Sequence, residues 1–193
     1  MKYIIVLMIV FLGIQSCKTE EIDPNISGKV IKGDINEKFW GNTNFRIGYS
    51  NKCTTNIHLG IWVNDENRFL RESLNISKIP LKIGTFEIIE HKYSNNNCFN
   101  DPIISPNSVD GSYNTSQDDG HVLKDTYLVL NNLKEKNKLT ITKLDLTNKY
   151  IEGEFDATFL LKRDENGNKI YKDSADTLRF RGVKFQASIV NLM

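Results

Sequence analysis

The stretch Ile151 to Leu161, IEGEFDATFLL, decides the fold, because its apolar and polar residues alternate strictly. Successive side chains of a β-strand point to opposite faces, so this alternation predicts a strand with one buried and one solvated face. The residues expected in the core are Ile151, Gly153, Phe155, Ala157, Phe159 and Leu161, and those expected in solvent are Glu152, Glu154, Asp156 and Thr158. Such a strand is typical of an antiparallel sheet that is covered on one side only.

The same period of two recurs in both directions along the chain. Further strands are expected over residues 39–49, 53–63, 83–89, 126–130, 139–146 and 178–189. In the last of these the apolar positions change from even to odd numbers at Gly182, which predicts a β-bulge there. The dipeptide Asn166-Gly167 predicts a tight hairpin turn. We therefore expect an all-β fold, either an antiparallel β-sandwich or a meander-like β-barrel of about eight to ten strands.

Two segments depart from this pattern. Residues 68–77 are compatible with one short turn of helix, whereas Ser94 to Gly120 is long, polar and rich in Asn, Asp, Ser and Gly. Loops of more than about 15 residues are uncommon in compact domains, and they are usually functional or disordered. A ligand contact is therefore expected in the segment from Ser94 to Gly120.

The N-terminus reads as a targeting segment. Lys2 precedes an apolar run over residues 3–14, which is shorter than the roughly 20 residues that a transmembrane helix needs and fits a secretory signal. The following Ile14-Gln15-Ser16-Cys17 resembles the bacterial lipobox. That resemblance implies that residues 1–16 are a lipoprotein signal peptide and that Cys17 is acylated. An ordinary cleaved signal with an unrelated cysteine is the alternative.

The lipobox resemblance also implies where the protein is located. Acyl chains on Cys17 would anchor it to the outer membrane of the cell envelope, on the periplasmic face or the cell surface. The polar residues 17–26 are then a flexible tether, and residues 27–193 are a single β domain.

Two of the three cysteines remain once Cys17 is set aside. Cys53 and Cys98 form an even pair in an oxidising compartment, which predicts a disulfide. Closing a loop of about 46 residues would stabilise the fold by about 4 kcal/mol on the chain-entropy model. Two free thiols are the alternative, and a zinc site has too few ligands at the usual spacings.

Charge narrows the range of partners. Without Lys2, the basic and acidic residues balance at 24 each, and no basic block is present to bind nucleic acid. The expected partners are the membrane, through Cys17, and a small molecule, a glycan or another envelope protein.

Two stretches of the second half resemble a known group of proteins. LTITKLDLTNKYIEGEFDATFLL, residues 139–161, and LRFRGVKFQASI, residues 178–189, are similar to the core and closing strands of small Bacteroidetes lipoproteins that carry a domain of unknown function. The matching positions are Leu139, Ile141, Leu144, Asp145, Ile151, Gly153, Phe155, Gly182 and Phe185. The resemblance implies a sandwich-like or barrel-like lipoprotein, and it supplies no activity for the protein.

Candidate ligand-binding residues are aromatic or imidazole side chains that could line a cavity. Trp40, Tyr49, His58 and Trp62 are the candidates, with His58 and Trp62 expected on one solvated strand face. No catalytic residue, metal site or cofactor is expected, since neither the three histidines nor Asp118-Asp119-Gly120-His121 has a metal-binding spacing. The sequence therefore favours a non-enzymatic binding module, with an envelope scaffold protein or a hydrolase as alternatives.

Overall fold

The computed structural model of the chain describes residues 28–40, 44–50, 53–90, 107–132 and 134–191. These residues contain no helix, which confirms the all-β prediction, and none of their elements is a helix long and apolar enough to cross a membrane. The strands of this part of the chain are β1 (Gly28–Ile35), β2 (Lys38–Phe39), β3 (Asn44–Ser50), β4 (Cys53–Asn64), β5 (Leu70–Pro80), β6 (Gly84–Glu90), β7 (Ser108–Gln117), β8 (Val122–Val129), β9 (Lys138–Asp145), β10 (Tyr150–Leu161) and β11 (Thr177–Asn191).

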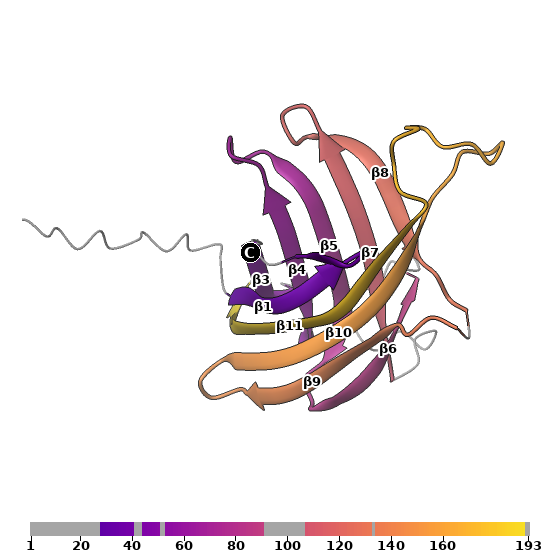
Figure 1. Cartoon of the computed structure of the whole chain (residues 1–193). Helices are drawn as coiled ribbons and strands as arrows, with labels where there is room; N and C mark the ends of the chain where they lie inside the picture. Colours follow the sequence, from indigo (N-terminus) through magenta and orange to yellow (C-terminus); the bar gives the residue numbers. More distant parts are fainter. Residues whose placement is uncertain (1–27, 41–43, 51–52, 91–106, 133, 192–193) are drawn as a thin grey trace, which may run out of the picture.

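All eleven of these strands belong to one hydrogen-bonded sheet that folds over on itself. Its order is β2-β1-β11-β3-β4-β5-β7-β6-β9-β10-β8, with β10 also paired to β11 and β7 also paired to β8. In Figure 1, β1, β11, β10 and β9 cross in front of β3, β4, β5 and β7, so the core lies between two crossing layers. Most pairs are antiparallel as expected, but β11–β3 and β6–β7 are parallel, so the sheet is mixed.

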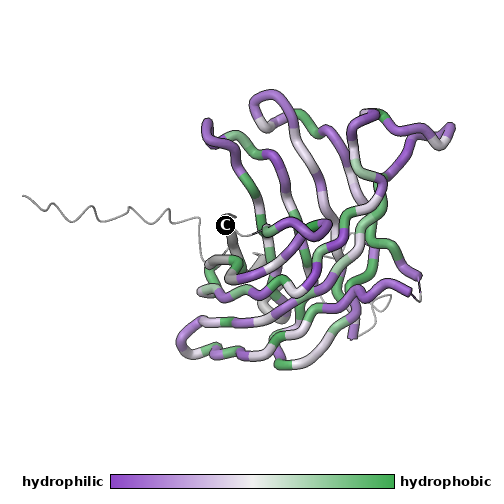
Figure 2. Tube along the Cα trace, in the orientation of Figure 1, coloured by the Kyte–Doolittle hydropathy of each residue, from purple (hydrophilic) through white to green (hydrophobic). Residues whose placement is uncertain are grey.

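The expected face of β10 is the buried one. The side chains that the alternation placed in the core are all buried, and Glu152, Glu154 and Asp156 are partly exposed. Thr158 departs from the pattern, since it is fully buried on the polar face. The alternation is visible as changes between apolar and polar colours along the strands in Figure 2.

The bulge predicted at Gly182 is also present. Phe155 of β10 pairs with Val183 of β11. The next core-facing residue of β10, Ala157, pairs with Phe180. Between these two pairs the chain advances by two residues on β10 and by three residues on β11, so β11 holds the one extra residue of a bulge. Gly182 has a φ of 57°, in the left-handed region that glycine adopts at little cost.

Aromatic side chains fill the centre of the core. The centroid of the Phe180 ring lies 4.9 Å from the ring centroid of Trp40, 5.3 Å from that of Tyr113 and 5.7 Å from that of Phe159. The three pairs are edge-on or tilted. Edge-on contacts of this kind are the favoured geometry of aromatic pairs. Branched aliphatic residues surround them, among them Ile47, Ile57, Leu59, Ile61, Leu74, Ile76, Ile88, Val109, Leu139 and Ile141.

Two expectations about the irregular segments were wrong. Residues 68–77 form no helical turn, because Leu70–Pro80 is the strand β5, which pairs with β4 and β7. The expected long loop from Ser94 to Gly120 contains the ten-residue strand β7, which lies between β5 and β8. Both strands contribute to the core, since Leu74 and Ile76 of β5 and Val109 and Tyr113 of β7 are buried there.

The connection between β10 and β11 carries the expected turn and packs against β8. Gly167 has a φ of 79°, and its backbone N–H donates to the carbonyl of Asp164. Farther along, the buried hydroxyl of Ser174 donates to the Asp125 carboxylate at 2.6 Å. This contact holds the connection against the end of the core.

Candidate functional site

A groove of about 580 Å³ lies across β5, β7 and β8, and we call it the outer groove. Its lining contains five small polar residues, Ser73, Ser112, Asn114, Ser116 and Thr126, which we call the floor. Leu70, Gly120, His121, Leu123, Leu128 and Lys162 complete the described lining. The volume falls in the range of about 300–1,000 Å³ that is typical of small-molecule sites.

Strand register explains why the floor residues meet. Ser73 of β5 lies directly opposite Asn114 of β7, and Asn114 lies directly opposite Thr126 of β8. Residues that face each other across neighbouring strands project from the same side of the sheet. The core-facing neighbours on the same strands are Leu74, Tyr113 and Tyr127, so the floor belongs to the opposite, outward face.

The floor side chains have unused hydrogen-bonding capacity. The structure records no hydrogen bond between the side chains of Ser73, Ser112, Asn114, Ser116 and Thr126 and any other residue that it describes. Each of these hydroxyl and amide groups can both donate and accept. A ligand in the groove would therefore meet five polar groups that are not engaged elsewhere in the described part of the fold.

Two hairpin ends form the upper rim. Gly120, with a φ of 86°, lies so close to Leu70 that a Cβ atom on it would be 2.6 Å from the Leu70 backbone nitrogen. Register shifts beside Ser116 and beside Leu70 mark bulges in the same region. Bulges bend and twist strands locally, so they curve this end of the sheet around the groove.

The ionisable side chains of the described outer groove are His121 and Lys162. His121 and Asp119 form an exposed contact of 3.3 Å, and the backbone N–H of His121, which donates to the Asp119 carboxylate, lowers the pKa of Asp119. The described lining holds no carboxylate, and Lys162 is its one lysine. No hydroxyl of a described serine donates to His121, so the rim does not form a Ser–His–Asp arrangement.

The four residues predicted to bind a ligand do not lie together. Trp62 is opposite Ser73 on the same sheet face, which places it beside the outer groove, and its ring lies over Gly60 at 3.4 Å from the ideal Cβ position. His58 is on the same face of β4 beyond Gly60. Trp40 is buried in the core and its indole N–H donates to Glu72 at 3.2 Å. Tyr49 belongs to β3, and its side chain is outside the described part of the structure.

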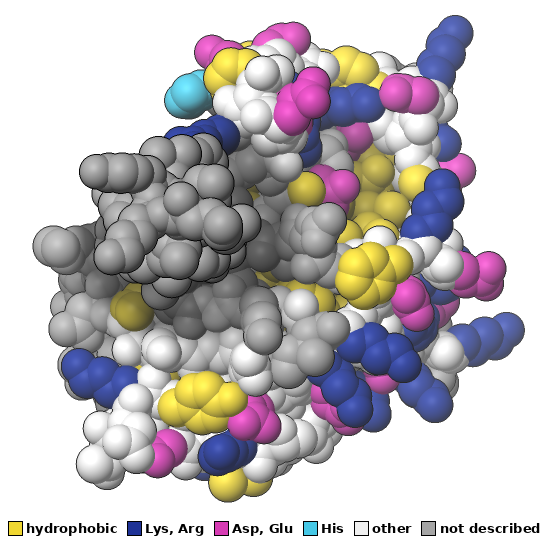
Figure 3. All heavy atoms as spheres, turned by 60° about the vertical axis from the view of Figure 1, so that its left-hand side comes forward, with side chains coloured by type: hydrophobic (Ala, Val, Ile, Leu, Met, Phe, Trp, Pro, Cys, Tyr) yellow, Lys and Arg dark blue, Asp and Glu magenta, His cyan; other side chains and the backbone are white. Residues whose placement is uncertain are grey.

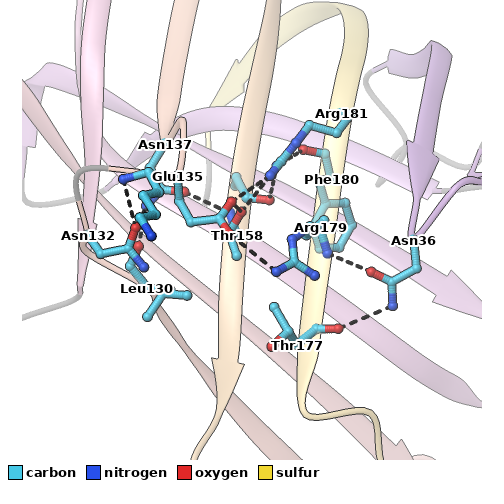
Figure 4. A network of polar contacts seen from close by, with 12 residues as sticks. Asn36, Leu130, Asn132, Glu135, Asn137, Thr158, Thr177, Arg179, Phe180 and Arg181 are labelled. Atoms are coloured by element: carbon cyan, nitrogen blue, oxygen red, sulfur yellow. Dashed lines mark hydrogen bonds and ion pairs between the residues drawn. The ribbon is translucent and has the colours of Figure 1, made fainter.

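A second, smaller hollow of about 310 Å³ borders Glu87, Asn131, Asn132, Glu135 and Asn137. Glu135 is engaged in structural contacts, shown in Figure 4: it accepts from the buried Thr158 hydroxyl and from Arg181, both at 2.8 Å, and from Arg179 at 3.3 Å. The Thr158 hydroxyl and the two guanidinium groups lower the pKa of Glu135. This hollow therefore offers fewer free groups to a ligand than the outer groove does.

The acidic residues of β10 have structural partners. Glu152 accepts from the Tyr150 hydroxyl at 2.7 Å, Glu154 lies 3.9 Å from Lys184, and Asp156 accepts from the backbone N–H of Gly182. The described residues contain no group of three or more His, Cys, Asp or Glu side chains that could hold a metal ion. On the face seen in Figure 3, acidic and basic side chains are interspersed rather than gathered in a patch of one sign.

The cysteine predictions fall outside the described residues. Cys17 and Cys98 lie in undescribed segments, and Cys53 is described only by its backbone, as the first residue of β4. Both the acylation of Cys17 and the disulfide between Cys53 and Cys98 stay predictions.

Sequence reasoning missed the outer groove because it missed β7, which contributes Ser112, Asn114 and Ser116. The segment from Ser94 to Gly120 was expected to carry a ligand contact, but as a loop and not as the floor of a sheet. Comparison of the chain with protein-family models, with curated proteins and with solved structures gives no match.

Proposed function

We propose that this chain is a lipid-anchored protein of the cell envelope, and that its β domain binds a ligand in the outer groove without catalysing a reaction. The observation that supports binding is the set of five uncommitted polar side chains in a groove of about 580 Å³. In small-molecule sites of this size, a small number of placed polar groups fixes the orientation of the ligand. The lipobox resemblance at Cys17 supports the anchor.

The binding proposal is tested with a substitution that fills the groove. Asn114 lies in the middle of the floor, between Ser73 and Thr126, so Asn114→Trp should occupy the space of a ligand. Ser188→Trp is the matched control, because Ser188 is an exposed serine on β11, away from the lining of the groove. Circular dichroism and urea unfolding establish that both variants fold.

The readout is thermal stabilisation of the full chain in detergent by a panel of oligosaccharides, short peptides, nucleotides and fatty acids. A ligand that binds the native state raises the melting temperature. We expect at least one class to stabilise the wild type and Ser188→Trp but not Asn114→Trp. If no class does so, the binding proposal is wrong.

The anchor has its own test. Cys17→Ala should move the protein from the detergent phase to the aqueous phase in a partitioning experiment, because the acyl chains supply the membrane affinity. Retention of the variant in the detergent phase would contradict the anchor and leave the binding proposal standing.

A further inference from the structure

The chemistry of the outer groove narrows the class of its ligand. Serine and threonine hydroxyls and the asparagine amide both donate and accept hydrogen bonds, and these are the groups that form the floor. Sugar hydroxyls have the same dual character. A hydroxyl-rich ligand could therefore pair with Ser73, Asn114 and Thr126 in either direction without leaving a buried group unsatisfied.

The part of the lining that β8 contributes contains two leucines and one threonine. Leu123, Thr126 and Leu128 all line the outer groove, so apolar side chains lie on both sides of the central hydroxyl. A pyranose ring presents hydroxyl groups at its edge and C–H groups on its face. The arrangement around Thr126 fits that combination.

Charge argues against a ligand with several charges. His121 and Lys162 are the ionisable side chains of the described lining, so a ligand with several charges would lose hydration and meet at most two charged partners. Both side chains are exposed to water, and Lys162 lies beside Thr126, because its backbone N–H donates to the Thr126 carbonyl.

Backbone pairing argues against a peptide that binds as an added strand. β7 is paired with β5 on one side and with β8 on the other over residues 112–115, so its main-chain groups in the floor are used within the sheet. β-strand addition needs an unpaired edge. A ligand in the floor would therefore meet side chains only.

From these observations we infer that the ligand of the outer groove is a short neutral oligosaccharide. This inference rests on the proposed binding function and deepens it. Asn114 is the central contact, Ser73 and Thr126 flank it, and Leu123 and Leu128 contact ring faces. Trp62, opposite Ser73 on β4, extends the same surface.

The test is a glycan array of neutral and acidic oligosaccharides, with short peptides on the same support, probed with the full chain in detergent. Hits are measured by titration calorimetry with the individual oligosaccharide. We expect binding of one or more neutral glycans, abolition by Asn114→Trp and no change in Ser188→Trp. Asn114→Asp, which keeps the shape but replaces the amide donor with a negative charge, should weaken binding about tenfold or more.

The outcomes separate this inference from the proposed function. Binding of peptides or of acidic glycans alone, with the same loss in Asn114→Trp, would overturn the oligosaccharide inference and support a binding module. Neutral-glycan binding that Asn114→Trp leaves unchanged would place the site elsewhere and overturn the inference. Asn114→Asp that binds as well as the wild type would remove Asn114 from the contact and overturn it as well.

Discussion

The carboxylate of Asp156 accepts a hydrogen bond from the backbone N–H of Gly182 at 2.8 Å. This contact joins β10 to β11 at the residue where β11 changes the face that it turns to the core. The side chain on the solvated face of one strand thus satisfies the N–H group that the bulge frees on the next. Gly182 and Asp156 together allow Phe180 and Val183, which are three positions apart in the sequence, both to be buried.

Replacing Gly182 should destabilise the fold through its backbone alone. Its φ of 57° disfavours residues with a Cβ, whereas no atom lies within 4 Å of the position that a Cβ would take. Gly182→Ala should therefore lower the free energy of unfolding by about 1 kcal/mol, measured by urea denaturation. Gly182→Asn should lose less, because asparagine tolerates the left-handed region.

The control for Gly182 is Ser188→Ala, an exposed position on the same strand that should change stability by less than about 0.5 kcal/mol. Equal stability of Gly182→Ala and the wild type would show that the bulge relaxes to another conformation.

The strands that the sequence predicted well are those with an unbroken period. In β10 every second residue from Ile151 to Leu161 is buried, and in β11 the one interruption is marked by a glycine. Local alternation was sufficient to predict these two strands, because the sequence of each strand alone shows which of its residues face the core and which face solvent.

The strands that the sequence predicted poorly have interrupted periods whose causes are tertiary. In β5 a register shift at Ser77 and Lys78 separates the buried Ile76 from the buried Ile79. In β7 a core-facing position is Gly111, where a Cβ would lie 2.5 Å from a methyl group of Ile88 on the neighbouring strand β6. A small residue required by packing removes the apolar signal that would have identified the strand.

The outer groove could not be predicted for a related reason. Its floor combines one residue of β5 with residues of β7 and β8. Which strands are neighbours, and in which register, is decided by long-range pairing that a single sequence does not encode locally. Small polar residues on a solvated face also carry no signal that separates a binding surface from an ordinary one.

Replacing Thr158 by valine should destabilise the protein although the shapes match. The buried hydroxyl donates to Glu135 at 2.8 Å and accepts from Arg181 at 2.9 Å. Valine would leave each of these charged groups without one partner, at a cost of about 1–3 kcal/mol in the free energy of unfolding. The matched control is Thr126→Val in the outer groove, where the hydroxyl has no partner among the described residues. That variant should stay within about 0.5 kcal/mol of the wild type.

Glu135 should make stability depend on pH in the acid range. Its pKa is lowered below the ordinary value of 4.5, first by the Thr158 hydroxyl and then by Arg179 and Arg181. A carboxyl with a lowered folded-state pKa contributes stability above its unfolded pKa, and that contribution is lost as the pH falls through the folded value. Urea unfolding measured from pH 6 down to pH 3 should therefore show a smaller decline in Glu135→Gln than in the wild type. Parallel curves for the two proteins would contradict this role.

The ion pair between Lys78 and Asp110 should be the most sensitive charged contact in the described part of the fold. The two groups are 3.0 Å apart, and their side chains are only 6% and 2% exposed. Removing one partner leaves the other charge buried without it, so Asp110→Ala should cost about 3–5 kcal/mol in urea unfolding. The double variant Lys78→Met/Asp110→Leu removes both charges and should recover a large part of that loss.

An exposed pair provides the comparison: Lys143 lies 3.6 Å from Glu152, and Lys143→Ala should cost no more than about 1 kcal/mol. A double variant as unstable as Asp110→Ala would mean that the cost comes from lost packing and not from an uncompensated charge.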